Sequence, residues 1–451
     1  MIKPTNRLII WAGIVFIPFS AIIVIVQPVV ALILTVLTFL FLIMVIADGF
    51  FASGRLKGIS IELPEVIRLS KGKEAEISLI INNMGNRLRE IHIGIPFPVE
   101  MISADPDMVV TLPSENERSS ITWPCRALKR GNYFLSICYL GSLSPLTFWH
   151  YRKKSRIKSE IRVYPDIFHD RKGISFLLQN RGIGLHSQRL IGKGREFEQL
   201  REYMPGDSYE DIHWKATAKR RYPVTKVFQI ERTQDVYIIL DASRMSNRMT
   251  EDNTKKNKED NERLTILERY ISAALVMGLV TERVGDLFGL VAFSNNVDRF
   301  VRAKKGKVHF NTCRDTLYTL EPVKTSPDFS ELITFISLRI RHRALLIFLT
   351  NLDDPVLADN FIDQAGILSK KHLVVVNMLN PGGAEPLFSS SDAASTTDVY
   401  RNLGRHLVHG NLLSIERRLK KRGIGFLMLN NEKLNLQLIS QYLSIKEKQQ
   451  L

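Results

Sequence analysis

The chain has 451 residues, which is too long for one ordinary hydrophobic core and predicts two or three domains. Its 45% hydrophobic and 24% charged residues exclude an intrinsically disordered chain. The formal net charge of +16 favours an anionic surface or partner. The chain has three cysteines, an odd number, and none of them forms a CxxC motif. Buried free thiols in a reducing compartment are therefore expected. The alternative is a disulfide between Cys125 and Cys138.

The first predicted element is a membrane hairpin. Residues 8–47 contain no Asp, Glu, Lys, Arg or His. A membrane span needs about 20 apolar residues, so this stretch holds two helices, at about 8–26 and 29–47, separated at Gln27 and Pro28. A cleavable signal peptide has one shorter apolar region. Residues 1–57 are therefore predicted to form a transmembrane α-hairpin.

The charges flanking this hairpin predict its orientation. Lys3 and Arg7 precede the first helix, while Arg55 and Lys57 follow the second. Because cytoplasmic flanks are enriched in Lys and Arg, both termini are expected in the cytoplasm of a two-pass inner (plasma) membrane protein. Four basic clusters suit the anionic cytoplasmic leaflet. No nucleic-acid-binding motif accompanies these clusters, which lie at 152–158, 302–307, 339–343 and 417–422.

Two further domains and a connecting segment follow. Residues 58–165 alternate apolar and polar side chains in short runs, which is typical of an antiparallel β-sandwich with an immunoglobulin-like outline. Residues 166–232 form a mixed segment. In it, 196–204 is expected to be helical, 205–207 a turn, 211–218 a short helix and 224–232 a strand.

Residues 233–451 are predicted to form a doubly wound α/β domain. Continuous apolar strands are expected at 236–241, 287–293, 344–350, 372–378 and 424–429. Amphipathic helices are expected between them, at about 264–284, 309–320, 330–342, 355–370, 400–422 and 432–445. Asp241 and residues 350–354 then lie at the carboxyl ends of strands, where such sheets bind ligands. The polar stretch 247–263 is expected to be a flexible loop.

Asp241-Ala-Ser243 resembles the start of the D-x-S-x-S metal loop of von Willebrand factor A-type domains. That resemblance implies a Mg²⁺ site formed by Asp241, Ser243, Thr325 and Asn351, since hard cations prefer carboxylate and hydroxyl oxygens. Met245 replaces the second serine, and Asn351 stands where the motif usually has aspartate. A thioether is a poor ligand for Mg²⁺, so a degenerate site with weak or no metal binding is expected, and no other cofactor.

Residues 192–219 carry a second, more specific pattern. They resemble the signature of the bacterial "domain of unknown function 58" family, whose hairpin, β-domain and A-type domain the rest of the chain also resembles. Asp207 and Asp211 are interpreted as an ion-pair network with Arg201 and Lys215 around an anchoring Trp214. The matching residues are Glu196, Phe197, Arg201, Tyr203, Gly206, Asp207, Asp211, Trp214 and Lys215.

The predicted function is that of a membrane-anchored, non-enzymatic adaptor that presents the A-type domain in the cytoplasm. The family resemblance implies a MoxR-type AAA+ ATPase as partner, in chaperone-like assembly of envelope or membrane proteins. One alternative is a membrane-proximal hydrolase using Asp207, Asp211 and His213, which would need these side chains to converge in an open pocket. The other is a binder of anionic polymers, which would need a contiguous basic face.

Overall fold

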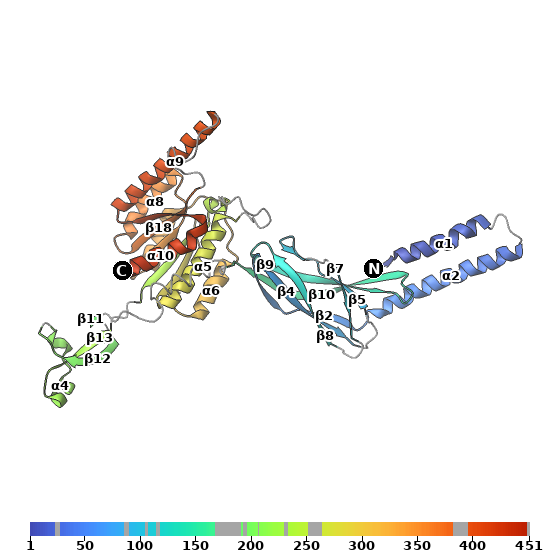
Figure 1. Cartoon of the computed structure of the whole chain (residues 1–451), viewed down its shortest axis with the longest axis horizontal. Helices are drawn as coiled ribbons and strands as arrows, with labels where there is room; N and C mark the ends of the chain where they lie inside the picture. The colour runs from blue at the N-terminus through green and yellow to red at the C-terminus, as the bar shows by residue number, and fades with distance from the viewer. Residues whose placement is uncertain are drawn as a thin grey trace. The chain divides into compact units, whose positions relative to one another are not determined.

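The computed structural model describes residues 1–22, 28–84, 90–103, 107–113, 118–166, 191–192, 196–205, 207–229, 233–250, 264–381 and 396–448. The chain divides into two compact units, Met1–Asp166 and Ile167–Leu451. Helices and four separate sheets are distributed over them (Figure 1). The prediction of a mixed α/β protein with several sheets is therefore confirmed.

The first unit contains two sheets. One has four strands in the order β2-β4-β8-β6, and the other has the path β1-β10-β9-β5-β7, with β3 pairing in parallel with β10. Most neighbouring strands are antiparallel, as expected for this part of the chain. The strands are β1 (Ile2–Pro4), β2 (Ile59–Glu62), β3 (Val66–Ser70), β4 (Glu74–Asn83), β5 (Glu90–Gly94), β6 (Met101–Ile102), β7 (Asp107–Thr111), β8 (Arg118–Ala127), β9 (Gly131–Leu143) and β10 (Trp149–Tyr164).

One apolar core joins the two sheets of this unit. Alternation along β4 buries Ile77, Leu79 and Ile81, because successive side chains of a strand point to opposite faces. Leu140 and Ile161 of the other sheet belong to the same cluster. All three cysteines of the chain are free and buried, so the expected free thiols are confirmed.

Two helices near the N-terminus carry most of the exposed apolar side chains of the first unit. Helix α1 is Asn6–Ile22, and helix α2 is Pro28–Arg55. One stretch among the described residues, Thr35–Ala52 in α2, is long and apolar enough to cross a membrane; α1 contributes a shorter apolar stretch, Asn6–Ile17.

Helix α2 begins at the predicted break but does not end at residue 47. It continues for two further turns, because those turns are fixed to the β9–β10 connection. The buried Asp48 carboxylate accepts hydrogen bonds from the Ser144 hydroxyl and from the Leu146 N–H (3.0 Å). The Trp149 indole donates to the carbonyl of Val45 (2.8 Å).

Residues 191–229 form a small module within the second unit. Its three strands, in the order β11-β13-β12, are β11 (Ile191–Gly192), β12 (Glu196–Glu202) and β13 (Val224–Gln229). The 3-10 turn η1 (Tyr209–Asp211) and helix α4 (Trp214–Arg220) lie between β12 and β13.

The prediction of a helix at 196–204 is wrong, because this segment is the strand β12. The antiparallel register with β13 shifts between Phe197 and Gln199. Such a bulge puts residues that are three apart in sequence on the same face of the strand. Residues three apart also share one face of a helix, so the sequence pattern resembles that of a helix. The predicted helix at 211–218 and strand after 224 are confirmed in outline.

The body of the second unit is a six-stranded sheet in the order β16-β15-β14-β17-β18-β19. Its strands are β14 (Asp235–Asp241), β15 (Leu287–Phe293), β16 (Val297–Lys304), β17 (Ala344–Leu349), β18 (Leu373–Leu379) and β19 (Gly425–Leu429). All neighbours are parallel except β15 and β16. The antiparallel edge strand β16 was not predicted; its half-exposed, charged sequence lacks the continuous apolar run of the other strands.

Helices cover both faces of this sheet. On one face, α5 (Ile266–Val284), α6 (Lys307–Leu317) and α10 (Leu434–Glu447) contribute to one core cluster. On the other, α7 (Phe329–Arg339), α8 (Pro355–Leu368) and α9 (Thr396–Lys421) contribute to a second. Side-chain caps fix where helices begin: the Asp354 carboxylate, for example, accepts from the N–H groups of Val356 and Leu357.

The strand order reverses between β14 and β17. After β14 the chain adds β15 and β16 on one side, and then β17, β18 and β19 on the other. Ligands of open parallel sheets bind outside the carboxyl ends of the strands at such a switch point. Asp241 ends β14, and Thr350 follows β17 directly, so the predicted site residues lie at this edge.

Candidate functional site

The candidate site is centred on the buried side chain of Asp241. One carboxylate oxygen accepts a hydrogen bond from the Ser243 N–H (2.8 Å), and the other accepts from the Thr350 hydroxyl (2.7 Å). The Ser243 hydroxyl in turn accepts from the N–H of Met245 (3.3 Å), at the start of the 3-10 turn η2 (Arg244–Asn247). Asp241 therefore serves as the acceptor that fixes the loop between β14 and η2 to the end of β17.

Burial has a clear electrostatic effect on this carboxyl. Asp241, Ser243 and Thr350 are fully inaccessible to solvent. Burial raises the pKa of Asp241, because it penalises the charged form, and the hydrogen bonds from Ser243 and Thr350 partly offset this effect. No Lys or Arg contributes to the pKa shift of this carboxyl.

Asn351 is held by a second set of hydrogen bonds. Its side-chain oxygen accepts from the hydroxyl of Tyr270 (2.9 Å), and its amide nitrogen donates to the carbonyl of Met245 (3.4 Å). The same Tyr270 hydroxyl accepts from the N–H of Leu379 at the end of β18 (3.2 Å). Tyr270, fully buried on α5, thereby connects the ends of β17 and β18.

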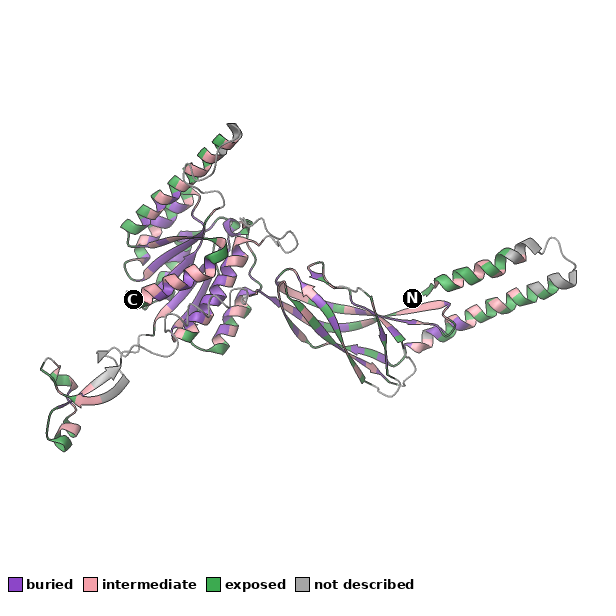
Figure 2. Cartoon of the chain, in the orientation of Figure 1, coloured by how far each residue is buried: buried purple, intermediate pink, exposed green. Residues whose placement is uncertain are grey.

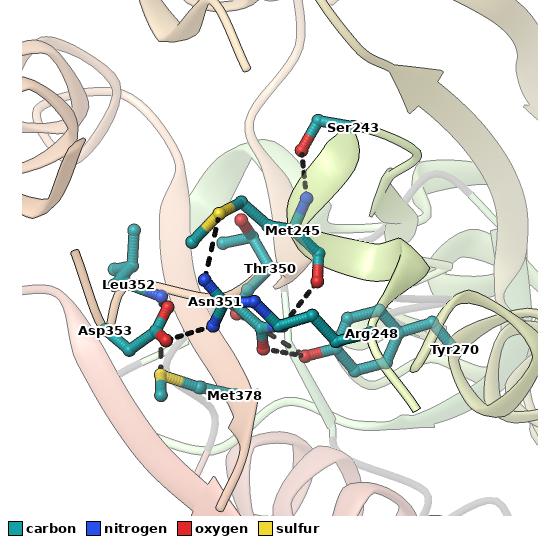
Figure 3. Close-up of polar contacts among 9 residues, drawn as sticks. All are labelled: Ser243, Met245, Arg248, Tyr270, Thr350, Asn351, Leu352, Asp353 and Met378. Atoms are coloured by element: carbon teal, nitrogen blue, oxygen red, sulfur yellow. Dashed lines mark hydrogen bonds and ion pairs between the residues drawn. The ribbon is translucent and has the colours of Figure 1, made fainter. Parts of the chain in front are cut away.

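A guanidinium group lies beside this loop (Figure 3). One amino group of Arg248 is 3.5 Å from the sulfur of Met245, and the other pairs with the Asp353 carboxylate. About half of the Arg248 side chain is exposed, whereas 19% of the Asp353 side chain is. The expectation that the polar stretch from 247 onward is a loop without fixed structure is wrong for residues 247–250: Arg248 is paired and Met249 forms an isolated β-bridge with Thr265. Residues 251–263 lie outside the described residues.

These residues do not fit a Mg²⁺ ion. The four expected ligands include one carboxylate, and both of its oxygens are committed to donors within a fully buried pocket. The Asn351 oxygen is taken by Tyr270, and a guanidinium and a thioether occupy the side of the loop where a second serine would stand. Hard divalent ions require several free oxygen ligands. In the described part of the chain no cluster of three or more His, Cys, Asp or Glu side chains suits a metal.

Thr325 is not joined to the other three expected ligands by a side-chain contact. Its hydroxyl donates to the side-chain oxygen of Asn295 (3.4 Å). Its backbone carbonyl accepts from the N–H of Arg244 (2.9 Å), so the loop that carries it does lie against η2. The sequence prediction thus identified a loop that does lie beside η2, but Thr325 itself is not placed as a metal ligand.

A cleft with both polar and apolar lining residues opens beside the Arg248–Asp353 pair at the carboxyl edge of the sheet. Its volume is about 200 Å³, and its lining comes from the segments that follow β14, β17, β18 and β19. The polar lining residues include Arg248, Asn351, Asp353, Asn380 and Asn431. This lining places the Arg248–Asp353 ion pair and the amides of Asn380 and Asn431 along the cleft.

In the module of residues 191–229, the structure brings Arg201 and Asp207 together. The guanidinium of Arg201 is 2.6 Å from one carboxylate oxygen of Asp207, and the other oxygen accepts from the Met204 N–H (3.0 Å). The Tyr203 and Tyr209 rings stack with centroids 5.8 Å apart. His213 caps α4 by accepting a hydrogen bond from the Ala216 N–H through its Nδ1 (3.0 Å). These contacts shape the loop between β12 and α4.

The expected anchoring role of Trp214 is contradicted. This side chain is 70% exposed, and Tyr209 is 75% exposed, because both lie on the outer surface of short turns that have little core beneath them. Lys215 is also exposed, and Asp211 is half-buried in η1. The side chains of Glu196 and Phe197, and Gly206 itself, lie outside the described residues.

Two residues of the site, Arg248 and Tyr270, were not singled out from the sequence. Thr350 and Asp353 were predicted only as members of the stretch 350–354 at the carboxyl end of a strand, without a role of their own. Arg248 stood in a stretch whose composition indicates a loop. Met245 and Arg248 are three residues apart, and one 3-10 turn brings residues at this spacing together. This spacing was the sequence signal that could have indicated their contact.

The doubly covered, mostly parallel sheet and its buried Asp-x-Ser loop at the switch point define a von Willebrand factor A-like domain. Residues 199–386, from β12 into the segment after β18, match the family described as "Protein of unknown function DUF58". The resemblance recognised in the signature is thereby confirmed for this part of the chain. The helices α1 and α2 and the sheets of the first unit lie outside the matched residues.

Several solved structures are similar to the chain, all at low identity. The SpRpn10 VWA domain is 11% identical, covers 46% of this chain and 95% of its own, and has a TM-score of 0.27. The PilB minor pilin from Streptococcus sanguinis is 11% identical, covers 85% and 93%, and has a TM-score of 0.31. An uncharacterized membrane spanning protein from Vibrio fischeri is 14% identical, covers 48% and 100%, and has a TM-score of 0.18. No curated protein matches the chain.

Proposed function

We propose that this protein is a membrane-anchored, non-enzymatic adaptor. Its A-type domain and signature module present interaction surfaces in the cytoplasm to a MoxR-type AAA+ ATPase, in chaperone-like assembly of envelope or membrane proteins. The observation that carries the proposal is the exposure of Trp214 on a module whose loop is fixed by its own ion pair.

An exposed tryptophan at the first residue of α4 is suited to binding a protein. Trp214 contributes little to its own fold, so most of its apolar area is free to be buried by a partner. Trp, Tyr and Arg are the residues most enriched at interface hot spots, where a few side chains carry most of the binding energy. Two further large side chains within ten residues of Trp214 in the sequence are also exposed: Tyr209 (75%) and Met204 (60%).

The A-type domain supports the proposal through its carboxyl-edge cleft. The cleft is lined by a cation, a carboxylate and amides, which are groups that recognise an extended polypeptide segment. Arg248 and Asp353 give this edge a paired cation and carboxylate without a bound ion. A docking face formed in this way would be independent of divalent metal.

The membrane part of the proposal is supported by α2, with its candidate span Thr35–Ala52. We propose that α1 and α2 cross the membrane as a hairpin and that the sheets of the first unit separate it from the rest of the chain. Lys3, Arg7, Arg55 and Lys57 flank the apolar helices and favour cytoplasmic placement of both ends.

The alternatives find less support. In a hydrolase, Asp207 and His213 would have to act on a substrate, but the Asp207 carboxylate is paired with Arg201 and the Nδ1 of His213 caps a helix. For a binder of anionic polymers, the cluster at 417–422 would have to be free. Three of its cations are instead paired: Arg418 with Asp359, Lys420 with Glu416 and Arg422 with Asp363.

The test is affinity capture of the detergent-solubilised full chain with and without ATP, followed by mass spectrometry. Wild type and Trp214→Ala are compared with Phe134→Ala, a matched control because Phe134 of β9 is also 70% exposed. We expect wild type and Phe134→Ala to capture an AAA+ ATPase and Trp214→Ala to lose it. Equal capture by Trp214→Ala, or no ATPase with wild type, would contradict the proposal.

A further inference from the structure

Helix α9 has two halves with different surroundings. In its C-terminal half, Leu412, Ile415 and Leu419 are buried in the core that also contains α7 and α8. In its N-terminal half, five large apolar side chains are exposed: Val399 (55%), Tyr400 (76%), Leu403 (47%), Leu407 (61%) and Val408 (39%). Figure 2 shows burial confined to the C-terminal half of this helix.

Four of these residues, Val399, Tyr400, Leu403 and Leu407, form a stripe on one side of the helix, here called the α9 stripe, and Val408 lies outside it. A helix turns by about 100° per residue, so positions 399, 403 and 407, four residues apart, lie on one face, and position 400 lies within about 100° of position 399. On the same geometry the buried residues 412, 415 and 419 lie on a face roughly 140° away from the centre of the stripe. The stripe is therefore not a continuation of the face that packs on the domain; it is a second apolar face.

The charge of the segment indicates what the stripe contacts. From Val399 to Ile415 the sequence contains no Asp or Glu, whereas it contains Arg401, Arg405, His406 and His409. By helical geometry, positions 405 and 409 lie outside the arc of the stripe, and position 406 lies next to its edge. An apolar stripe opposite a cationic polar face is the composition of helices that lie in the plane of an anionic bilayer surface.

The chain also carries the means of keeping this helix near a bilayer. The candidate span in α2 belongs to the same polypeptide, so a weak contact of the second unit with the same membrane becomes effectively intramolecular. A polybasic or cationic segment then gains further from anionic headgroups.

We propose that the N-terminal half of α9 inserts its stripe into the headgroup region of an anionic membrane, which gives the A-type domain a membrane contact of its own. This proposal rests on the membrane anchoring proposed above, but not on the ATPase partner. Val399, Tyr400, Leu403 and Leu407 face the acyl boundary, and the cationic side faces the headgroups.

Site-specific labelling of the full chain provides the test. All three native cysteines are buried, and burial raises the pKa of the thiols of Cys125, Cys138 and Cys313 to about 11, 12 and 12, which leaves them poorly reactive. A cysteine introduced by Leu403→Cys is therefore selectively labelled with the environment-sensitive dye NBD. The matched control is Asn402→Cys, the neighbouring position on the polar side of the helix.

The labelled protein is reconstituted in nanodiscs of phosphatidylcholine with or without phosphatidylglycerol. With phosphatidylglycerol, we expect the emission at position 403 to shift to the blue and to intensify at least about twofold, with a smaller change at position 402, and we expect salt to weaken the effect. Adding Leu407→Asp should abolish the change at position 403.

Each contrary result has a distinct meaning. A chain that does not enter nanodiscs contradicts the anchoring of the proposed function. A chain that enters them, but whose label at position 403 stays in water with and without anionic lipid, overturns the inference about α9 alone. A label at position 403 that is equally blue-shifted with and without phosphatidylglycerol overturns it as well, because the environment of the stripe then does not depend on anionic lipid.

Discussion

The guanidinium of Arg248 is shared between the sulfur of Met245, at 3.5 Å, and the carboxylate of Asp353. Met245 stands at the position where a metal-binding A-type loop would place a serine hydroxyl. The loop therefore lacks one hard oxygen ligand, the serine hydroxyl, and has the guanidinium of Arg248 beside it instead. A soft sulfur and a guanidinium are compatible, whereas a guanidinium and a divalent cation at one place repel each other.

This relationship predicts that the A-type domain is insensitive to divalent metal. The thermal unfolding midpoint of the full chain in detergent should be the same in EDTA and in millimolar Mg²⁺, because a ligand that does not bind the native state cannot stabilise it. The combined change Met245→Ser, Asn351→Asp and Arg248→Ala restores oxygen ligands and removes the competing cation, and should introduce a Mg²⁺-dependent rise in the midpoint. If Mg²⁺ raised the unfolding midpoint of the wild-type protein, the assignment of Arg248 to the place of a divalent cation would be wrong.

Substitutions of Asp241 separate the contribution of its charge to stability from the contribution of its hydrogen bonds. Asp241→Ala should lower the free energy of unfolding by about 2–4 kcal/mol, because the Ser243 N–H and the Thr350 hydroxyl lose a buried acceptor. Asp241→Asn should cost at most about 1 kcal/mol, since its oxygen accepts from Ser243 and its amide donates to a rotated Thr350 hydroxyl.

The pH dependence of the Asp241→Asn effect has a defined sign. The folded pKa is raised above the ordinary 3.8, so the native state binds the proton more tightly than the unfolded chain. Stability contributed by this group is therefore lost as pH rises from 3.8 through the raised value. Relative to wild type, Asp241→Asn should gain stability over that interval, as measured by urea unfolding. If Asn is as damaging as Ala at neutral pH, the negative charge itself is required.

Trp214 supplies a prediction in which stability and binding separate. Because the side chain is 70% exposed, Trp214→Ala should change the free energy of unfolding by less than about 0.5 kcal/mol. Ile212→Ala, two residues away but 7% exposed, should cost about 2 kcal/mol or more. Differential scanning fluorimetry of the two variants measures this difference. A loss of 3–5 kcal/mol with Trp214→Ala would restore the packed anchor that its sequence context indicated.

The elements that were predicted correctly are those whose pattern is decided by burial. β14, β15, β17, β18 and β19 are continuous apolar runs because both faces of the sheet are covered, and the helices between them are amphipathic. β12 was mistaken for a helix because a bulge gives its ladder a three-residue spacing. Arg248, Tyr270 and Thr350 could not be assigned, since their roles depend on strand order, which brings the ends of β14, β17 and β18 together.

Reporter fusions test the membrane topology. A reporter placed before Met1 and one placed after Leu451 should both read cytoplasmic, because Lys3 and Arg7 on one flank and Arg55 and Lys57 on the other favour the cytoplasmic side. A reporter inserted at Gln27 should read as external. If the C-terminal fusion were instead cleaved by protease added to intact cells, the topology and the cytoplasmic placement of the A-type domain would both be wrong.

His372 should make the A-type domain sensitive to acid. This residue is 3% exposed, and neither ring nitrogen has a hydrogen-bond partner. Burial, together with the neighbouring Lys371, lowers its pKa from 6.5 to about 4. The unfolded chain therefore binds a proton at a pH where the folded domain does not. The stability associated with the neutral ring is fully present above pH 6.5 and is lost as pH falls towards 4, by about 2–3 kcal/mol in total.

The variant His372→Phe keeps a planar ring in this site but removes its titration. In urea unfolding from pH 7 to pH 4, the difference in stability between His372→Phe and wild type should grow in favour of the variant as pH falls, since only wild type must exclude a proton from the buried ring. A constant difference between His372→Phe and wild type across this range would show that the ring is protonated in the folded domain or accessible to water, and would refute its assignment as a buried neutral group.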